Sequence, residues 1–206
     1  EVLAQAVPQL DAAGFQVHFH AIGDRAVREA LDAIEAAVTA NGRRDSRHHI
    51  AHLQVVHPED VPRFRALGVA ANMQSLWAAL EPQMVDLTLP FPGPPRDAWQ
   101  HPWGDLQRAG TTLVSGSDWS VSTPNPMSAI HVAVNRRSAP GYAEGEYEAF
   151  LPEQRLDLGS ALAAYTAGSA WVNRQDEAGS IAVGRLADVV VLDRDPFAAP
   201  AEEIGL

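Results

Sequence analysis

Two histidines and one aspartate lie near the ends of three separate strand-like runs in this sequence. His20 ends one run, His52 lies in a second, and Asp118 follows the third, residues 111–115. A titratable group at the end of a buried strand costs free energy unless something compensates it. In parallel α/β proteins, that end of the strand is also where active sites gather. Two imidazoles and a carboxylate from distant segments are typical of a metal centre.

The composition restricts which groups could hold that metal. The chain of 206 residues contains no cysteine, and all 15 of its basic residues are arginine. Thiolate ligands are therefore excluded, and histidine and carboxylate ligands remain. These donors suit a divalent ion, Zn²⁺ before others, which lowers the pKa of a bound water to about 7 and polarises a carbonyl group.

The charge and hydropathy patterns exclude several classes of partner. The formal net charge is −11 with scattered acids, whereas nucleic acids and anionic membranes select basic surfaces. No apolar run reaches the roughly 18 residues of a membrane span. The sequence opens with Glu1 and shows no signal peptide. We therefore expect a cytoplasmic protein that binds neither nucleic acid nor membrane.

Strand and helix patterns alternate along the first two thirds of the chain. This alternation predicts βαβ units and a parallel sheet, and therefore an α/β fold. Asp24 is predicted to cap the second helix. The expected strands are 15–20, 47–54, 69–74 and 111–117, and the expected helices are 2–13, 25–40, 58–67, 103–109, 124–137 and 156–170.

The C-terminal tail has a different pattern. Residues 179–185 and 187–193 are predicted to form two short strands about a glycine turn. A lone hairpin is at best marginally stable, so this one needs a sheet to join. Loops over residues 78–100 and 138–151, the second rich in glycine and tyrosine over 140–150, are expected to shape the substrate pocket.

Four segments in this order resemble the C-terminal half of the amidohydrolase superfamily, in particular the family-3 branch that includes N-substituted formamide deformylase. They are His-Ala-Ile-Gly-Asp at 20–24, His-Leu-Gln-Val-Val at 52–56, Gly-Ser-Asp-Trp at 116–119, and the tail 179–193. The resemblance implies the C-terminal half of a distorted (β/α)8 TIM-like barrel. Residues 1–178 would supply barrel strands 5–8, and residues 179–206 would supply strands of a small β-sandwich.

The same resemblance implies the roles of the site residues. His20 would be the metal ligand of the fifth barrel strand and His52 that of the sixth. Asp118 would be the ligand of the eighth strand and would also carry the proton. The implied reaction is hydrolysis of an amide or formamide C–N bond in a small molecule by a metal-activated water.

The sequence also departs from the family pattern. The family begins its site with a His-x-His pair on the first strand and a bridging carboxylate or carboxylated lysine on the fourth, and this sequence has no strands 1 to 4 to supply them. His18 has the His-x-His spacing to His20, yet we interpret it as an inward-facing neighbour. Ala51 stands where relatives usually have glutamate. The chain is thus a fragment, one of two polypeptides, or a decayed gene product, and we expect self-association or pairing with the missing N-terminal half.

Two further hypotheses compete with the hydrolase. One is an inactive remnant that binds a ligand or partner without turnover, and the other is a structural half-barrel that pairs with itself. Among the remaining polar residues, His48 and His49 are predicted at a strand edge or the surface. Arg136 and Arg137 are predicted at a solvated helix end, although an arginine pair could also hold a substrate carboxylate.

Overall fold

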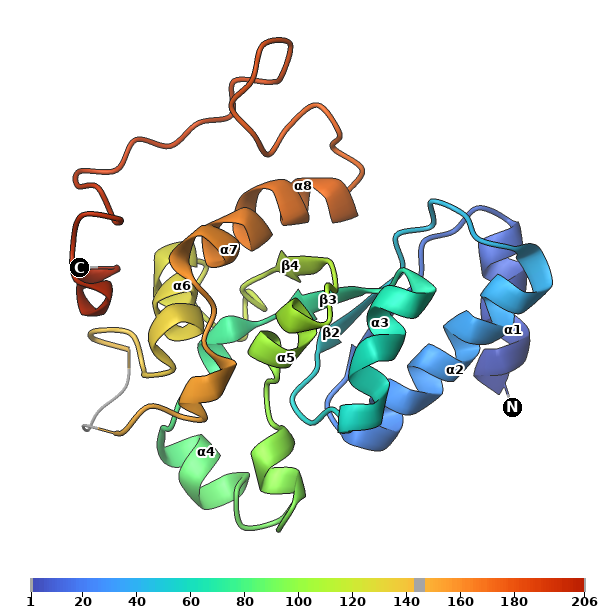
Figure 1. Cartoon of the computed structure of the whole chain (residues 1–206), viewed down its shortest axis with the longest axis horizontal. Helices are drawn as coiled ribbons and strands as arrows, with labels where there is room; N and C mark the ends of the chain where they lie inside the picture. Colours follow the sequence, from blue (N-terminus) through green and yellow to red (C-terminus); the bar gives the residue numbers. More distant parts are fainter. Residues whose placement is uncertain (1, 143–146, 206) are drawn as a thin grey trace. The chain divides into compact units, whose positions relative to one another are not determined.

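The computed structural model describes residues 2–142 and 147–205 (Figure 1). The chain divides into two compact units, the first formed by Glu1–Met73 and Trp99–Leu113 and the second by Gln74–Ala98 and Val114–Leu206. This division differs from the predicted boundary between residues 178 and 179, which stays a prediction. The predicted loop over 140–150 includes residues 143–146, which lie outside the described residues.

A parallel sheet organises the first unit. Strand β1 (His18–Ala21) pairs with β2 (His49–His52), and β2 pairs with β3 (Ala70–Met73). The sheet order is β1-β2-β3-β4, and β4 (Leu113–Ser115) is preceded by Thr112, whose carbonyl accepts from the N–H of Ala71 at 2.9 Å. The α/β class and the parallel sheet are therefore confirmed, although each strand is shorter than predicted.

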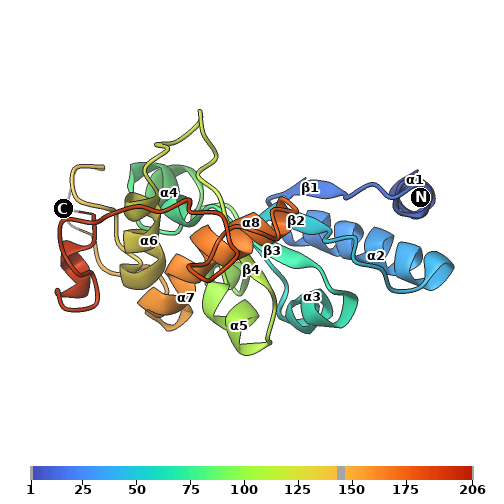
Figure 2. The ribbon, with the colours of Figure 1, turned by 90° about the horizontal axis from the view of Figure 1, so that it is seen from above.

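Amphipathic helices accompany the sheet, as Figure 2 shows for α2 and α3. Val27, Leu31 and Ile34 recur at a helical spacing in α2 and are fully buried. Gly23 takes the N-cap position and Asp24 is the first helical residue, so the predicted cap is displaced by one residue. The helices of this unit are α1 (Val2–Ala12), α2 (Asp24–Asn41), the 3₁₀ turn η1 (Pro58–Asp60), α3 (Val61–Leu67) and α5 (Trp103–Arg108).

The second unit is mainly helical among its described residues. The helix predicted over 156–170 is interrupted, because a π-helical turn at Ala164–Gly168 separates α7 from α8. Such turns are frequent at functional sites. The helical elements are η2 (Ser75–Trp77), α4 (Pro82–Leu87), α6 (Pro126–Asn135), η4 (Pro152–Gln154), α7 (Leu158–Ala163), α8 (Ser169–Val172) and η6 (Ala201–Glu203), and η3 (Arg96–Trp99) crosses the unit boundary.

The tail after α8 does not form the predicted hairpin. Residues 179–193 contain no strand and run as a loop in Figure 1. Their apolar side chains face solvent, with Ile181 93% and Val191 91% exposed. An extended segment needs a neighbouring strand to complete its backbone hydrogen bonds, and the described residues place none beside it. The predicted hairpin is therefore wrong for this chain taken alone, whereas the β-sandwich stays a prediction.

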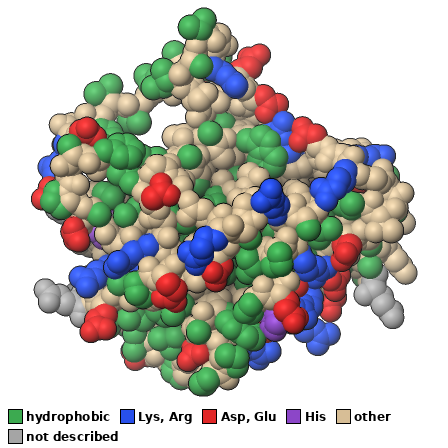
Figure 3. Space-filling model, in the orientation of Figure 1, with side chains coloured by type: hydrophobic (Ala, Val, Ile, Leu, Met, Phe, Trp, Pro, Cys, Tyr) green, Lys and Arg blue, Asp and Glu red, His purple; other side chains and the backbone are tan. Residues whose placement is uncertain are grey.

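Charged side chains of both signs are interspersed over the face of the molecule that Figure 3 shows. Within the described part of the chain, no helix has the length and apolar character needed to cross a membrane.

Candidate metal centre

His20 and His52 lie side by side at the ends of neighbouring strands. In the parallel register, His20 pairs with Ala51 and Ala21 pairs with His52. The centroids of the two imidazole rings are 4.4 Å apart, and the ring planes meet at 66°. Two of the three predicted ligands are therefore in contact, although 31 residues separate them in the sequence.

The contact depends on an unusual backbone conformation at His52. Regular alternation would put His52 on the face of Ala21, opposite to His20. Instead, His52 has φ 73° and Leu53 has φ 53°, a left-handed region that costs a non-glycine residue about 1–3 kcal/mol. The N–H of Leu53 donates to the carbonyl of Ala21 at 3.0 Å, which holds the bend against β1. We infer that this bend brings the His52 ring to the His20 side.

A second pair of imidazoles lies on the same face of the sheet. His18 pairs in register with His49, and their ring centroids are 4.3 Å apart. Asn72 of β3 places its Nδ2 3.1 Å from His49 Nδ1. Burial, together with the neighbouring His18 and His48, lowers the pKa of His49 to about 4. His49 is therefore neutral at pH 7, the state in which imidazole binds metal.

Asp118 belongs to the second unit, in the loop after β4. Like His52 it has a left-handed backbone, with φ 61°. Its carbonyl accepts from the N–H groups of Val121 at 2.7 Å and Ser122 at 3.2 Å, which closes a tight turn. The hydroxyl of Tyr165, from the π-helical turn, donates to the carbonyl of Gly116 at 3.2 Å. The loop is thus fixed at both ends and presents a half-buried carboxylate.

The structure therefore brings together His20 and His52 within one unit and places Asp118 in the other. Convergence of all three on one ion stays a prediction. Among the described residues, no group of three or more His, Asp or Glu side chains is arranged to hold a metal ion. The His20–His52 pair nevertheless fits one, because two adjacent imidazoles are donors that Zn²⁺ prefers.

Sequence reasoning missed the surroundings of three polar residues. His49 lies on a central strand against His18, and His48 is 5% exposed, so neither occupies the predicted strand edge or surface. Arg136 is fully buried at the C-terminal end of α6, where a solvated helix end was predicted. His18 and His20 alternate along one predicted strand, and His49 lies on the next. This pattern was the available signal for a face shared by the three histidines.

The burial of Arg136 has a local cause. Arg136 is left-handed, with φ 56°, and its Nε donates to the carbonyl of Phe150 at 2.7 Å. The N–H of Phe150 donates back to the carbonyl of Arg136 at 2.8 Å. The returning chain therefore covers the guanidinium group, which a helical pattern over 124–137 cannot reveal.

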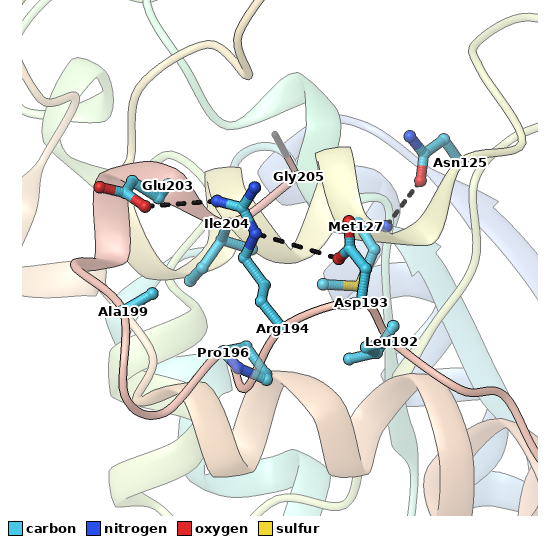
Figure 4. A pocket seen from close by; sticks show the side chains of 10 residues that line it. All are labelled: Asn125, Met127, Leu192, Asp193, Arg194, Pro196, Ala199, Glu203, Ile204 and Gly205. Atoms are coloured by element: carbon cyan, nitrogen blue, oxygen red, sulfur yellow. Dashed lines mark hydrogen bonds and ion pairs between the residues drawn. The ribbon is translucent and has the colours of Figure 1, made fainter.

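A separate hollow lies in the second unit, between α6 and the C-terminal segment (Figure 4). Arg194 extends across it, with Nη1 3.3 Å from Glu203 Oε2 and Nε 3.9 Å from Asp193 Oδ1. Met127 and Ile204 supply apolar walls. None of the predicted metal ligands lines this hollow.

Comparison with known proteins identifies relatives along nearly the whole chain. The model of the amidohydrolase family matches residues 1–205. The protein LONG AFTER FAR-RED 3 of Arabidopsis thaliana is 33% identical over 198 residues, which are 96% of this chain and 33% of that protein. YtcJ of Bacillus subtilis (strain 168) is 31% identical over 213 residues, covering 100% of this chain and 37% of YtcJ. The chain thus spans about a third of the length of these relatives.

A solved structure shows the same relationship in three dimensions. The crystal structure of an uncharacterized metal-dependent hydrolase from Pyrococcus horikoshii OT3 aligns with a TM-score of 0.74 and 26% identity. The alignment covers 98% of this chain and 38% of the solved chain.

Proposed function

The chain belongs to the amidohydrolase family, and on that ground we propose that it is part of a metal-dependent hydrolase that cleaves an amide or formamide C–N bond in a small molecule. The observation that carries the proposal is the His20–His52 contact, with rings 4.4 Å apart at the ends of adjacent parallel strands. Strand ends are where parallel α/β folds place their active sites, and strained left-handed residues such as His52 cluster at functional sites, which supports the proposal.

In this proposal, His20 and His52 hold a divalent ion, with Zn²⁺ favoured by their nitrogen donors. When bound, the ion supplies an activated water and polarises the substrate carbonyl. Asp118 would be the third ligand, and its carboxylate would take a proton from the attacking water and pass it to the leaving nitrogen. The fixed turn around Asp118 supports this role, because a proton carrier must be held within hydrogen-bond reach of the reacting atoms.

We further propose that the parallel sheet is half of a (β/α)8 barrel and that residues 179–193 join a β-sandwich. The chain's one-third coverage of its relatives and the exposed apolar tail support this architecture. Strand β1 stands at the edge of the described sheet, and an open parallel edge favours pairing with another chain. The partner would be the N-terminal half or a second copy.

Metal content and turnover test the proposal together. The purified chain, stripped by chelation and reloaded with Zn²⁺, is incubated with N-substituted formamides and N-acyl amines, and amine release is measured. We expect release in the parent and one bound ion fewer in His20→Ala and His52→Ala. His57→Ala, a half-exposed histidine of the same unit, serves as the matched control and keeps the parent content. Unchanged zinc content in both ligand variants would refute the metal assignment.

The second candidate is a half-barrel that binds a partner without turnover. The position of β1 at the open edge of the described sheet favours it, because such an edge can pair with another chain. It predicts an oligomer by light scattering together with no amine release, even when zinc is bound.

A further inference from the structure

His18, His49 and Asn72 form a polar row across three adjacent strands. His18 is opposite His49 in the register, and Ala51 is opposite Asn72, so the row follows one face of the sheet. His18 is exposed, whereas His49 and Asn72 are half-buried. Strands of parallel sheets are usually apolar on both faces, so three polar side chains in a row are unusual there. The row therefore needs a reason beyond packing.

We propose that His18, His49 and Asn72 form a second divalent-cation site, separate from the His20–His52 pair. Two imidazoles and an amide oxygen suit first-row ions such as Zn²⁺, Co²⁺ and Cu²⁺. The site lies wholly within the first unit and requires neither Asp118 nor catalytic turnover.

The spacing of the donor groups fits one ion. His49 Nδ1 and the Asn72 amide are 3.1 Å apart, close to the roughly 3.3 Å between two tetrahedral ligands with bonds of about 2.0–2.1 Å. A half-turn of the Asn72 amide replaces its nitrogen with its oxygen, because the two ends have nearly the same shape. The His18 ring lies beside His49, with the ring centroids 4.3 Å apart, and in the proposal it supplies the remaining donor.

The two histidine pairs are far enough apart to act separately. His18 and His20 are two residues apart on β1, a separation of about 6.6 Å along a strand. Each has its own imidazole partner on β2, since His18 contacts His49 and His20 contacts His52. One ion for each pair is therefore compatible with the sheet, and the row should bind more weakly because its third donor is an uncharged amide.

Metal stoichiometry separates the two sites. The chelator-stripped chain is dialysed against Zn²⁺ and, separately, Co²⁺, and bound metal is measured by mass spectrometry. We expect two ions in the parent, one in His49→Ala, one in His52→Ala and two in the control His57→Ala. Equal content in the parent and folded His49→Ala would overturn the second site. If bound metal were lost in His52→Ala and not in His49→Ala, the second site would be refuted and the proposed function would still stand.

A gain-of-affinity variant keeps the test decisive if His49→Ala fails to fold. Asn72→Asp replaces the amide oxygen with a charged carboxylate and should tighten Zn²⁺ binding at least about tenfold. Measured in the His52→Ala background by competition with a chelating dye, the gain reports on the row alone. Unchanged affinity in Asn72→Asp, with circular dichroism matching the parent, would also overturn the proposal.

Discussion

The imidazole of His48 donates to the carboxylate of Asp11, with 3.1 Å between Nε2 and Oδ1 and both side chains buried. The other ring nitrogen, Nδ1, accepts from the backbone N–H of Val17 at 3.0 Å, which fixes the proton on Nε2. Ser46 and Asn41 also donate to Asp11, at 2.5 and 2.8 Å. The network ties α1 to the segment that enters β2.

This network predicts a loss of stability in acid. Burial raises the pKa of Asp11, but hydrogen bonds from Ser46, Asn41 and His48 together outweigh it, so the net pKa is lowered. A carboxyl group with a folded pKa below its unfolded value of about 3.9 stabilises the fold above that pH, and the contribution disappears as the pH falls through the folded pKa.

Asp11→Asn should therefore flatten the dependence of the free energy of unfolding on pH below about 5. Urea titrations at a series of pH values measure the slope. Asp86→Asn, at an exposed position on α4, is the control and should keep the parent slope. A parent-like slope in Asp11→Asn would contradict the assignment.

The left-handed backbone at His52 predicts a difference between two variants that both lack the ring. His52→Gly should be more stable than His52→Ala by about 1 kcal/mol, because glycine adopts φ 73° without a Cβ penalty. Chemical denaturation of the metal-free proteins measures this difference. An alanine variant at least as stable as the glycine variant would show that the bend carries no strain.

Asp60 and Glu59 provide a matched pair of carboxylates. The buried Asp60 accepts from Arg28 Nε at 2.9 Å and from Arg63 Nη1 at 3.0 Å, whereas Glu59 is 78% exposed and 3.6 Å from Arg28. Asp60→Ala should cost about 2 kcal/mol, since it removes a buried acceptor of two hydrogen bonds from arginine, and Glu59→Ala less than about 0.5 kcal/mol. Similar losses in the two variants, measured by urea unfolding, would mean that burial does not set the strength of these ion pairs.

His131 of α6 holds the C-terminal segment, residues 201–205, by a hydrogen bond. Its Nδ1 donates to the carbonyl of Ile204 at 2.9 Å, and Asn135 Nδ2 donates to the carbonyl of Ala201 at 2.8 Å. His131→Ala should release this segment from α6 and open the hollow shown in Figure 4. Hydrogen exchange of residues 201–205 should then accelerate while exchange in α2 stays unchanged. If residues 201–205 of His131→Ala exchanged as slowly as in the parent, other contacts would be holding the segment on α6.

Sequence reasoning located the helices and strands better than it predicted the contacts between them. The spacing of hydrophobic residues located the parallel strands and α2. Each of these elements buries one face, and the residues of that face recur at a regular spacing in the sequence. The same patterns could not reveal the bend at His52 or the reversal at Arg136. Both are left-handed non-glycine positions maintained by contacts with distant segments, and composition gives no sign of them.

The candidate site shows the same limit. His20 and His52 could be named from their positions at strand ends, and the structure brings their rings together. The contact between His18 and His49 depends on the register of β1 against β2. That register is set by the packing of whole strands and helices, which a local stretch of sequence does not contain.

The uncovered tail has a consequence for handling the protein. Val189, Val190 and Val191 are each at least 63% exposed in a run of high β-propensity, and such runs seed intermolecular sheets when they lack a native neighbour. Truncation after residue 178 should therefore slow precipitation on concentration, observed as a later onset of turbidity than for residues 1–206.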